Sequence, residues 1–339
     1  MRIEDVAAHA AVSIKTVSRV LNNEPNVRQS TREHVLRSVE SLQYKPNLSA
    51  RSLAGQRSYV IALAYNNPSR NYLMEIQGGT LEACRANHYN LILAPIGVGA
   101  RRGTDIRAVF EYFKPDGVLL IPPLTDDKVV LSFLRDQGIP FACVAPKKPE
   151  DHIGVWMEDT AAAVELITAL IVMGHRRIGH IKGPTAHGAS GWRHAGYRQA
   201  LERAGLAYRP ELVSQGDFSF DSGVKASKSL LDLDEPPTAI FAANDDMAAG
   251  VIREARVRGI SIPKNLSVCG FDDTPIARHI YPALTTVRQP TAEMGHRATI
   301  ELLQRIKSLQ LGRMARVEHD VVFRESTCPP SAEPAKKPK

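Results

Sequence analysis

The strongest constraint on the fold is a pattern of strand-like and helical segments that occurs twice between residues 59 and 271. The first series has β-rich apolar runs at 59–64, 91–96, 117–121 and 141–145, with helical spacing over 71–88. The second has runs at 177–181, 238–242 and 267–271, with helical spacing over 160–174, 191–205, 221–233 and 246–259. Near-continuous apolar strands that alternate with helices indicate parallel sheets buried on both faces. We therefore predict an α/β core of two doubly wound lobes, with a ligand cleft outside the carboxyl ends of the strands.

The first residues of the chain follow a different pattern, with two short helical periodicities that meet at a turn. The apolar positions that would pack together are Ile3, Val6, Ala7, Ala10, Val12, Val17, Val20 and Leu21. Ser13 is a good N-cap for the second helix. Ile14, Lys15, Ser18 and Arg19 would then point away from the packed face. This is a helix-turn-helix pattern, which suits a DNA major groove, although a plain amphipathic helical hairpin would look similar.

A third helix is predicted next, and it favours the DNA-binding interpretation. Ser30 and Glu33 have the spacing of a capping box. The expected core face consists of Val35, Leu36, Val39 and Leu42. The helix should end before Pro46, because a residue that precedes proline resists helical geometry. With the segment 49–55 as a basic hinge, this makes an N-terminal all-α headpiece that can read DNA.

The positive charge is concentrated in the same region. The whole chain has a net charge of +7. Residues 1–58 hold nine Lys and Arg against five Asp and Glu, so +4 of that charge lies within the predicted headpiece and hinge. A basic excess that coincides with a DNA-binding motif predicts contacts with the phosphate backbone.

These residues resemble the lac repressor (LacI/GalR) family of bacterial transcription regulators, and the resemblance continues to about Cys328. The motifs that carry it are Ile3-x-x-Val-Ala, Val12-Ser-x-x-Thr-Val-Ser-Arg-Val-Leu-Asn22, Thr31-Arg32, Tyr44-x-Pro-Asn47 and the hinge Ala50-Arg-Ser-Leu-Ala54. Ala11 departs from the pattern, because the family has glycine in the turn, where a positive φ favours it.

The resemblance implies a role for each part of the chain. The expected domains are a headpiece at 1–46, a hinge at 47–57, a two-lobed periplasmic-binding-protein-like core at 58–328 and a disordered tail at 329–339. Lobe one would take about 58–157 and 288–316, and lobe two about 158–287 and 317–328. The DNA-binding residues would be Ser13, Ile14, Lys15, Thr16, Ser18, Arg19, Asn22, Asn47, Ala50 and Leu53. The hinge would fold on DNA, where Leu53 of each subunit wedges into the minor groove.

The cleft is expected to bind a small-molecule effector. Asn244 and Asp272 follow predicted strands, and Arg193 opens a predicted helix, where its guanidinium offers a donor fork. By resemblance these three residues match effector-binding positions, and Phe218 and Asn66 match others in the cleft. From the residues alone, Asn244 could equally be a helix cap and Asp272 a turn residue.

Other classes of protein fit the sequence less well. The glycines at 97–103 have the wrong spacing for a dinucleotide loop, His175 and His180 would not share a helix face, and no nucleophile has a plausible base. We therefore expect no enzyme, cofactor or metal. The four cysteines are scattered, as reduced and mostly buried thiols would be. No apolar run is long enough for a membrane span and no signal peptide is evident, so we expect a cytoplasmic protein that joins the nucleoid when bound to DNA.

The sequence thus predicts a DNA-binding transcription regulator, most simply a repressor of a carbohydrate uptake or catabolic operon. Its partners would be a pseudo-palindromic operator DNA, a sugar or sugar derivative between the lobes, and a second copy in a homodimer. The tail lacks the leucine heptads of a tetramerising helix. The alternatives are a sugar-binding protein of a transport system and a DNA-binding regulator that responds to no effector.

Overall fold

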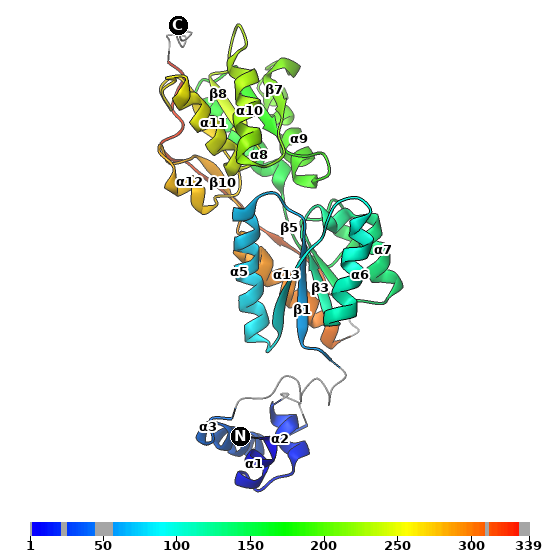
Figure 1. Ribbon diagram of the computed structural model, residues 1–339. Helices are drawn as coiled ribbons and strands as arrows, with labels where there is room; N and C mark the ends of the chain where they lie inside the picture. The colour runs from blue at the N-terminus through cyan, green and yellow to red at the C-terminus, as the bar shows by residue number, and fades with distance from the viewer. Residues whose placement is uncertain (1, 22–25, 45–56, 309–311, 332–339) are drawn as a thin grey trace. The chain divides into compact units, whose positions relative to one another are not determined.

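The computed structural model describes residues 2–21, 26–44, 57–308 and 312–331 (Figure 1). The chain divides into two compact units, residues 1–59 and 60–339. Most of the predicted hinge and most of the predicted tail lie outside the described residues, and the finer domain limits stay a prediction.

The first unit is a small bundle of three helices around one apolar core. The helices are α1 (Ile3–His9), α2 (Ile14–Leu21) and α3 (Gln29–Ser41). Its buried side chains are Val6, Ala7, Ala10, Val17, Val20, Val35 and Tyr44. The predicted helix-turn-helix is therefore confirmed. Ala11 has a φ of +46°, so the turn does require the positive φ for which glycine would be preferred.

Two details predicted for the third helix are wrong. The helix begins at Gln29 rather than after Ser30, and the Glu33 carboxylate accepts a hydrogen bond from the Gln29 side chain instead of closing a capping box. Leu36 is 46% exposed, whereas Ser38 is buried and donates to the backbone carbonyl of His34. A serine whose hydroxyl donates to a carbonyl of its own helix can occupy a buried position. The apolar pattern therefore assigned the buried face of α3 incorrectly at these two positions.

Lobe one of the second unit is built on a six-stranded parallel sheet with the order β11-β5-β4-β3-β1-β2. The strands are β1 (Val60–Tyr65), β2 (Asn90–Pro95), β3 (Gly117–Leu120), β4 (Phe141–Val144), β5 (Gly154–Met157) and β11 (Met314–Val317). Helices α5 (Arg70–Ala86) and α13 (Thr291–Lys307) cover one face, and α6 (Arg101–Phe113) and α7 (Lys128–Asp136) cover the other (Figure 1).

Lobe two contains a four-stranded parallel sheet with the order β7-β6-β8-β9. The strands are β6 (Ile178–Lys182), β7 (Val213–Gln215), β8 (Ala239–Ala242) and β9 (Ser267–Cys269). Its helices are α8 (Asp159–Val172), α9 (Gly188–Arg203), α10 (Phe220–Leu231), α11 (Asp245–Val257) and α12 (Pro275–His279). Two parallel-sheet lobes with flanking helices confirm the predicted fold class.

The chain passes between the lobes three times. The passages follow β5, β10 (Thr286–Arg288) and β11, and they lie at 157–159, 288–291 and 317–320. Strand β10 pairs antiparallel with β12 (Asp320–Val322), so two of the three passages are tied to each other by hydrogen bonds. The cleft is therefore bounded by a short, paired connection rather than by a loose linker.

Helices α5 and α13 pack unusually closely in lobe one. A Cβ placed on Gly79 would lie 1.7 Å from the carbonyl oxygen of Ala292, and one on Gly295 would lie 2.4 Å from that of Ile76. Only glycine lets the two backbones approach so closely, so α13 is held firmly to α5 although the two are far apart in sequence.

The structure also bears on the cysteines and on membrane insertion. All four thiols are free, with Cys84, Cys143 and Cys269 buried and Cys328 half-buried, as predicted. Burial raises the pKa of each of the three buried thiols. Within the described ranges, none of the helices has both the length and the apolar character needed to cross a lipid bilayer.

Candidate functional site

Helix α2 has one buried face and one exposed face, as a helix that reads DNA requires. Val17 and Val20 are buried in the headpiece core, whereas Ile14, Lys15 and Arg19 are exposed. The Ser13 hydroxyl accepts a hydrogen bond of 3.2 Å from the backbone amide of Thr16, which makes Ser13 the predicted N-cap. Thr16 and Ser18 are partly exposed beside them.

The other predicted DNA-binding residues, Asn22, Asn47, Ala50 and Leu53, lie outside the described residues. Their roles stay predictions that rest on the motif.

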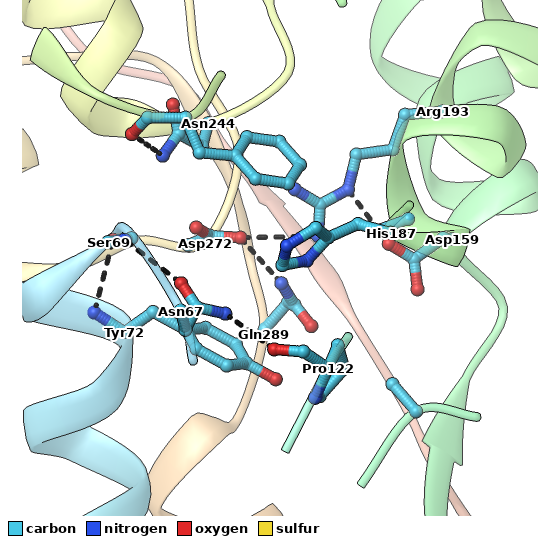
Figure 2. A pocket seen from close by; sticks show the side chains of 13 residues that line it. Asn67, Ser69, Tyr72, Pro122, Asp159, His187, Arg193, Asn244, Asp272 and Gln289 are labelled. Atoms are coloured by element: carbon cyan, nitrogen blue, oxygen red, sulfur yellow. Dashed lines mark hydrogen bonds and ion pairs between the residues drawn. The ribbon is translucent and has the colours of Figure 1, made fainter. Parts of the chain in front are cut away.

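A small cavity lies between the lobes of the second unit (Figure 2). It measures about 40 Å³. The lining residues are Asn67, Ser69, Tyr72, Pro122, Ala145, Asp159, His187, Ala189, Arg193, Phe218, Asn244, Asp272 and Gln289. They come from the carboxyl ends of strands in both lobes and from the passages between them, which is where ligands bind in doubly wound sheets.

Arg193 lies at the centre of the polar side chains in this cavity. It belongs to the second turn of α9, since the helix begins at Gly188 and not at residue 191 as predicted. The guanidinium is 4% exposed, with its Nε 2.8 Å from a carboxylate oxygen of Asp159 and its Nη2 3.3 Å from one of Asp272. It also lies 3.7 Å from the ring centroid of Phe271. This side chain is therefore fixed by charge and by stacking.

Asp272 follows β9 with a φ of +116°, a conformation that non-glycine residues rarely adopt. Its carboxylate accepts a hydrogen bond of 2.5 Å from the Gln289 side chain. Burial raises the pKa of Asp272 to about 7, against the lowering effects of Arg193 and Gln289. Backbone strain that surrounding contacts hold in place is frequent in binding sites.

Asn244 and Phe218 are joined on the lobe-two side of the cavity. The Asn244 side chain accepts from the backbone amide of Met247, which caps α11, and donates to the carbonyl of Phe218 at 2.9 Å. Asn244 is thus both a cap and a cavity residue, so the two alternatives were not exclusive. The Phe218 ring packs edge-on against His187 at 5.3 Å between centroids. Burial, helped by Arg193 and Lys147, lowers the pKa of His187 to about 4.

Asn66 is not among the residues that line the cavity, unlike the other four predicted effector residues. Its side chain donates to the carbonyl of Gly97 at 3.3 Å, and the neighbouring Asn67 lines the cavity instead. The sequence also missed Asp159, His187 and Gln289, each of which lies at or near the start of a helix or just beyond a strand. Gln289 directly follows β10 and Asp159 lies two residues after β5, but neither strand was predicted, so the sequence pattern offered no signal for these two residues.

The cavity offers hydrogen-bonding groups but no excess of positive charge. Among its lining residues Arg193 is the one cation, and it already faces two carboxylates. His187 is neutral at pH 7, since its pKa is about 4. Side-chain oxygens and amides around the Phe218 ring can therefore bind a ligand with several hydroxyl groups.

Comparison with known proteins identifies the family. Residues 2–47 match the bacterial regulatory proteins of the lacI family, and residues 167–327 match a periplasmic binding protein-like domain. The chain is 32% identical to catabolite control protein A of Priestia megaterium, over 96% of this chain and 98% of that protein. The chain belongs to the lacI family. The present chain is also 34% identical to the ribose operon repressor of Haemophilus influenzae, over 96% of this chain and 98% of that protein.

Solved structures of lacI-family proteins share the fold. A transcriptional regulator CelR–cellobiose complex superposes with a TM-score of 0.74 at 33% identity and covers 96% of this chain and 99% of its own. The lac repressor dimer bound to operator and an anti-inducer gives a TM-score of 0.76 at 25% identity, with coverages of 97% and 99%. The present lacI-family protein is accordingly a DNA-binding transcription regulator.

Proposed function

We propose that this regulator represses a carbohydrate uptake or catabolic operon and that a sugar in the cavity changes its affinity for the operator. The observation that carries the proposal is the convergence of Arg193, Asn244, Asp272 and Phe218 on one interlobe cavity in a lacI-family chain. Two relatives support it by name, since one represses a ribose operon and another was solved with cellobiose.

The chemistry of the cavity favours an uncharged sugar. The two oxygens of Asp272 can accept from neighbouring hydroxyls, and the amides of Asn67 and Gln289 add donors. A phosphate group would meet the Asp159 and Asp272 carboxyls, and the single guanidinium between them is already paired. Anions bind where cations are in excess, so we expect sugars to bind more tightly than their phosphates.

Operator binding would use two headpieces of a homodimer on a pseudo-palindromic site. Ile14, Lys15 and Arg19 would reach the bases, while Leu53 and the hinge would contact the minor groove. A sugar that favours one arrangement of the lobes would then change the distance between the points at which the two hinges begin. The effector site and the DNA-binding site would in this way be coupled over a distance. Such a regulator works on DNA in the bacterial cytoplasm, and we assign it no catalytic step.

The experiment measures the effect of sugars on operator affinity. An operator is first selected from random DNA with the full-length protein, and fluorescence anisotropy is then recorded with ribose, glucose, cellobiose and the corresponding phosphates. We expect one of the sugars to change the affinity and Asp272→Ala to abolish that change while binding to DNA alone stays close to wild type. Asp221→Ala, an exposed carboxylate in the same lobe, is the control. A normal response in Asp272→Ala would make Asp272 a turn residue only, and no response to any sugar would favour an effector-independent regulator.

A further inference from the structure

Asp246 joins the two lobes beside the cavity, through side chains that belong to none of the three chain passages. This residue lies in the first turn of α11, in lobe two. One of its carboxylate oxygens accepts from the Ser69 hydroxyl at 2.6 Å, and the other accepts from the Asn71 side-chain amide at 2.8 Å. Both donors belong to the start of α5 in lobe one. A single carboxylate therefore spans the gap between the lobes.

The local environment makes these hydrogen bonds favourable. Ser69 is the N-cap of α5, since its hydroxyl accepts from the backbone amide of Tyr72, and it is 4% exposed. The Asp246 carboxylate is half-buried and lies at the N-terminal end of its own helix as well as that of α5. The positive ends of two helices favour a negative charge there, and hydrogen bonds to an ionised group are stronger than neutral ones.

The size of the cavity gives the contact a consequence for ligand entry. A water molecule needs roughly 10–15 Å³ of such space, so 40 Å³ accommodates about three waters. Pockets that hold small-molecule ligands are commonly about 300–1,000 Å³. A sugar can therefore enter only when the lobes separate. Ser69 lines the cavity and also bonds to Asp246, so separation at this edge breaks the two hydrogen bonds.

We propose, on the premise that this cavity is the effector site proposed above, that Asp246 with Ser69 and Asn71 forms an interlobe latch that opens for each entry and release of effector. Asp246 does not line the cavity, so it is a positioning residue. Asp246 sets the balance between closed and open lobes. It thereby sets the apparent affinity for the effector, because the apparent affinity of a ligand that binds one state falls as more of the protein adopts the other state.

Hydrogen–deuterium exchange of the full-length protein, without DNA or sugar, tests the latch directly. Asp246→Ala is expected to speed exchange about tenfold in the α5 start, 67–73, and also in the α9 start, 187–193, because open lobes expose both walls of the cavity. Among the described residues, the α9 segment has no hydrogen bond to Asp246. If Asp246→Ala only disturbed the start of α5 locally, the exchange rate of the α9 segment would therefore stay as in the wild type. Strand β3, deep in lobe one, should exchange as in the wild type.

Two further variants complete the test. Asp221→Ala removes an exposed carboxylate from the first turn of α10 and should leave both segments at wild-type rates. Asn71→Ala removes one of the two hydrogen bonds, should give a smaller increase in both segments, and serves if Asp246→Ala does not fold. Faster exchange in 67–73 alone, or in neither segment, would overturn the latch. Since no sugar is present, this outcome is independent of whether the sugar panel identifies an effector.

Discussion

Replacing Asp272 by asparagine should change how stability depends on pH. In the folded protein burial raises the pKa of Asp272 to about 7, whereas in the unfolded chain it has its ordinary value of 3.8. The folded state therefore binds the proton more tightly. The stability that this proton contributes is fully present below pH 3.8 and is lost as the pH rises through 7. Asparagine has the same shape, but its amide does not titrate.

The size of the effect follows from the pKa difference. Each pH unit between the two values is worth about 1.4 kcal/mol, so the wild type should lose on the order of 3 kcal/mol relative to Asp272→Asn between pH 5 and pH 8. For a core of this size that corresponds to roughly 6–12 °C in melting temperature. Asp272 is 5% exposed, so little solvent screening reduces the value.

The measurement is a series of thermal unfolding curves of both proteins from pH 5 to pH 8. Asp159, another buried carboxyl, is present in both proteins. Burial and, after it, the Asp272 charge raise the pKa of Asp245, so the difference between the two curves reports the titration of this pair. Asp221→Asn, on the surface of lobe two, should melt in parallel with the wild type at every pH. If the difference between Asp272→Asn and wild type were constant with pH, the raised pKa would be wrong and the Arg193 ion pair would dominate.

Three other substitutions test the headpiece and the core. Arg19→Ala should weaken binding to a selected operator by about 1–3 kcal/mol and to random DNA much less, and equal losses in competition anisotropy would exclude base reading. Ser13→Ala removes the cap of α2, worth about 1 kcal/mol, and should speed amide exchange in that helix about fivefold, whereas unchanged exchange would make the cap unimportant. Gly79→Ala should lower the free energy of unfolding by about 3 kcal/mol in urea, because its Cβ would meet the Ala292 carbonyl. Gly78→Ala, with open space around it, is its control and should be neutral or slightly stabilising, so similar losses in both would contradict the close packing.

Periodicity was sufficient to predict the two lobes and the headpiece, because strands buried on both faces and amphipathic helices leave distinct apolar patterns. Most predicted strands and helices lie within a few residues of those observed. The elements α6, α7, α13, β5, β7 and β11 were not assigned. Helix α13 follows the second series and packs against lobe one. Its partner α5 lies about 200 residues earlier in the sequence, and no local pattern records such a contact.

The cavity was predicted less completely than the fold. Arg193, Phe218, Asn244 and Asp272 were found from strand ends and family motifs, and all four line it. Asn66 differs from Asn67 by one position, and successive side chains point in different directions at the end of a strand, so spacing alone could not choose between them. The pairing of Arg193 with Asp159 was unpredictable, because it depends on how two helices pack in lobe two.

Because the chain passes between the lobes three times, the connectivity also determines the order in which the two lobes can complete their folding during synthesis. The sheet of lobe two is made from one continuous stretch of chain, which runs from β6 to β9 and ends at Cys269. The sheet of lobe one lacks its edge strand until residues 314–317 have left the ribosome, and α13 emerges only shortly before them. Domains commonly fold from the N-terminus first. Here lobe one begins first and is finished last. While lobe two is synthesised, the β5 edge of the lobe-one sheet lacks its partner β11, and one face of that sheet lacks the cover of α13.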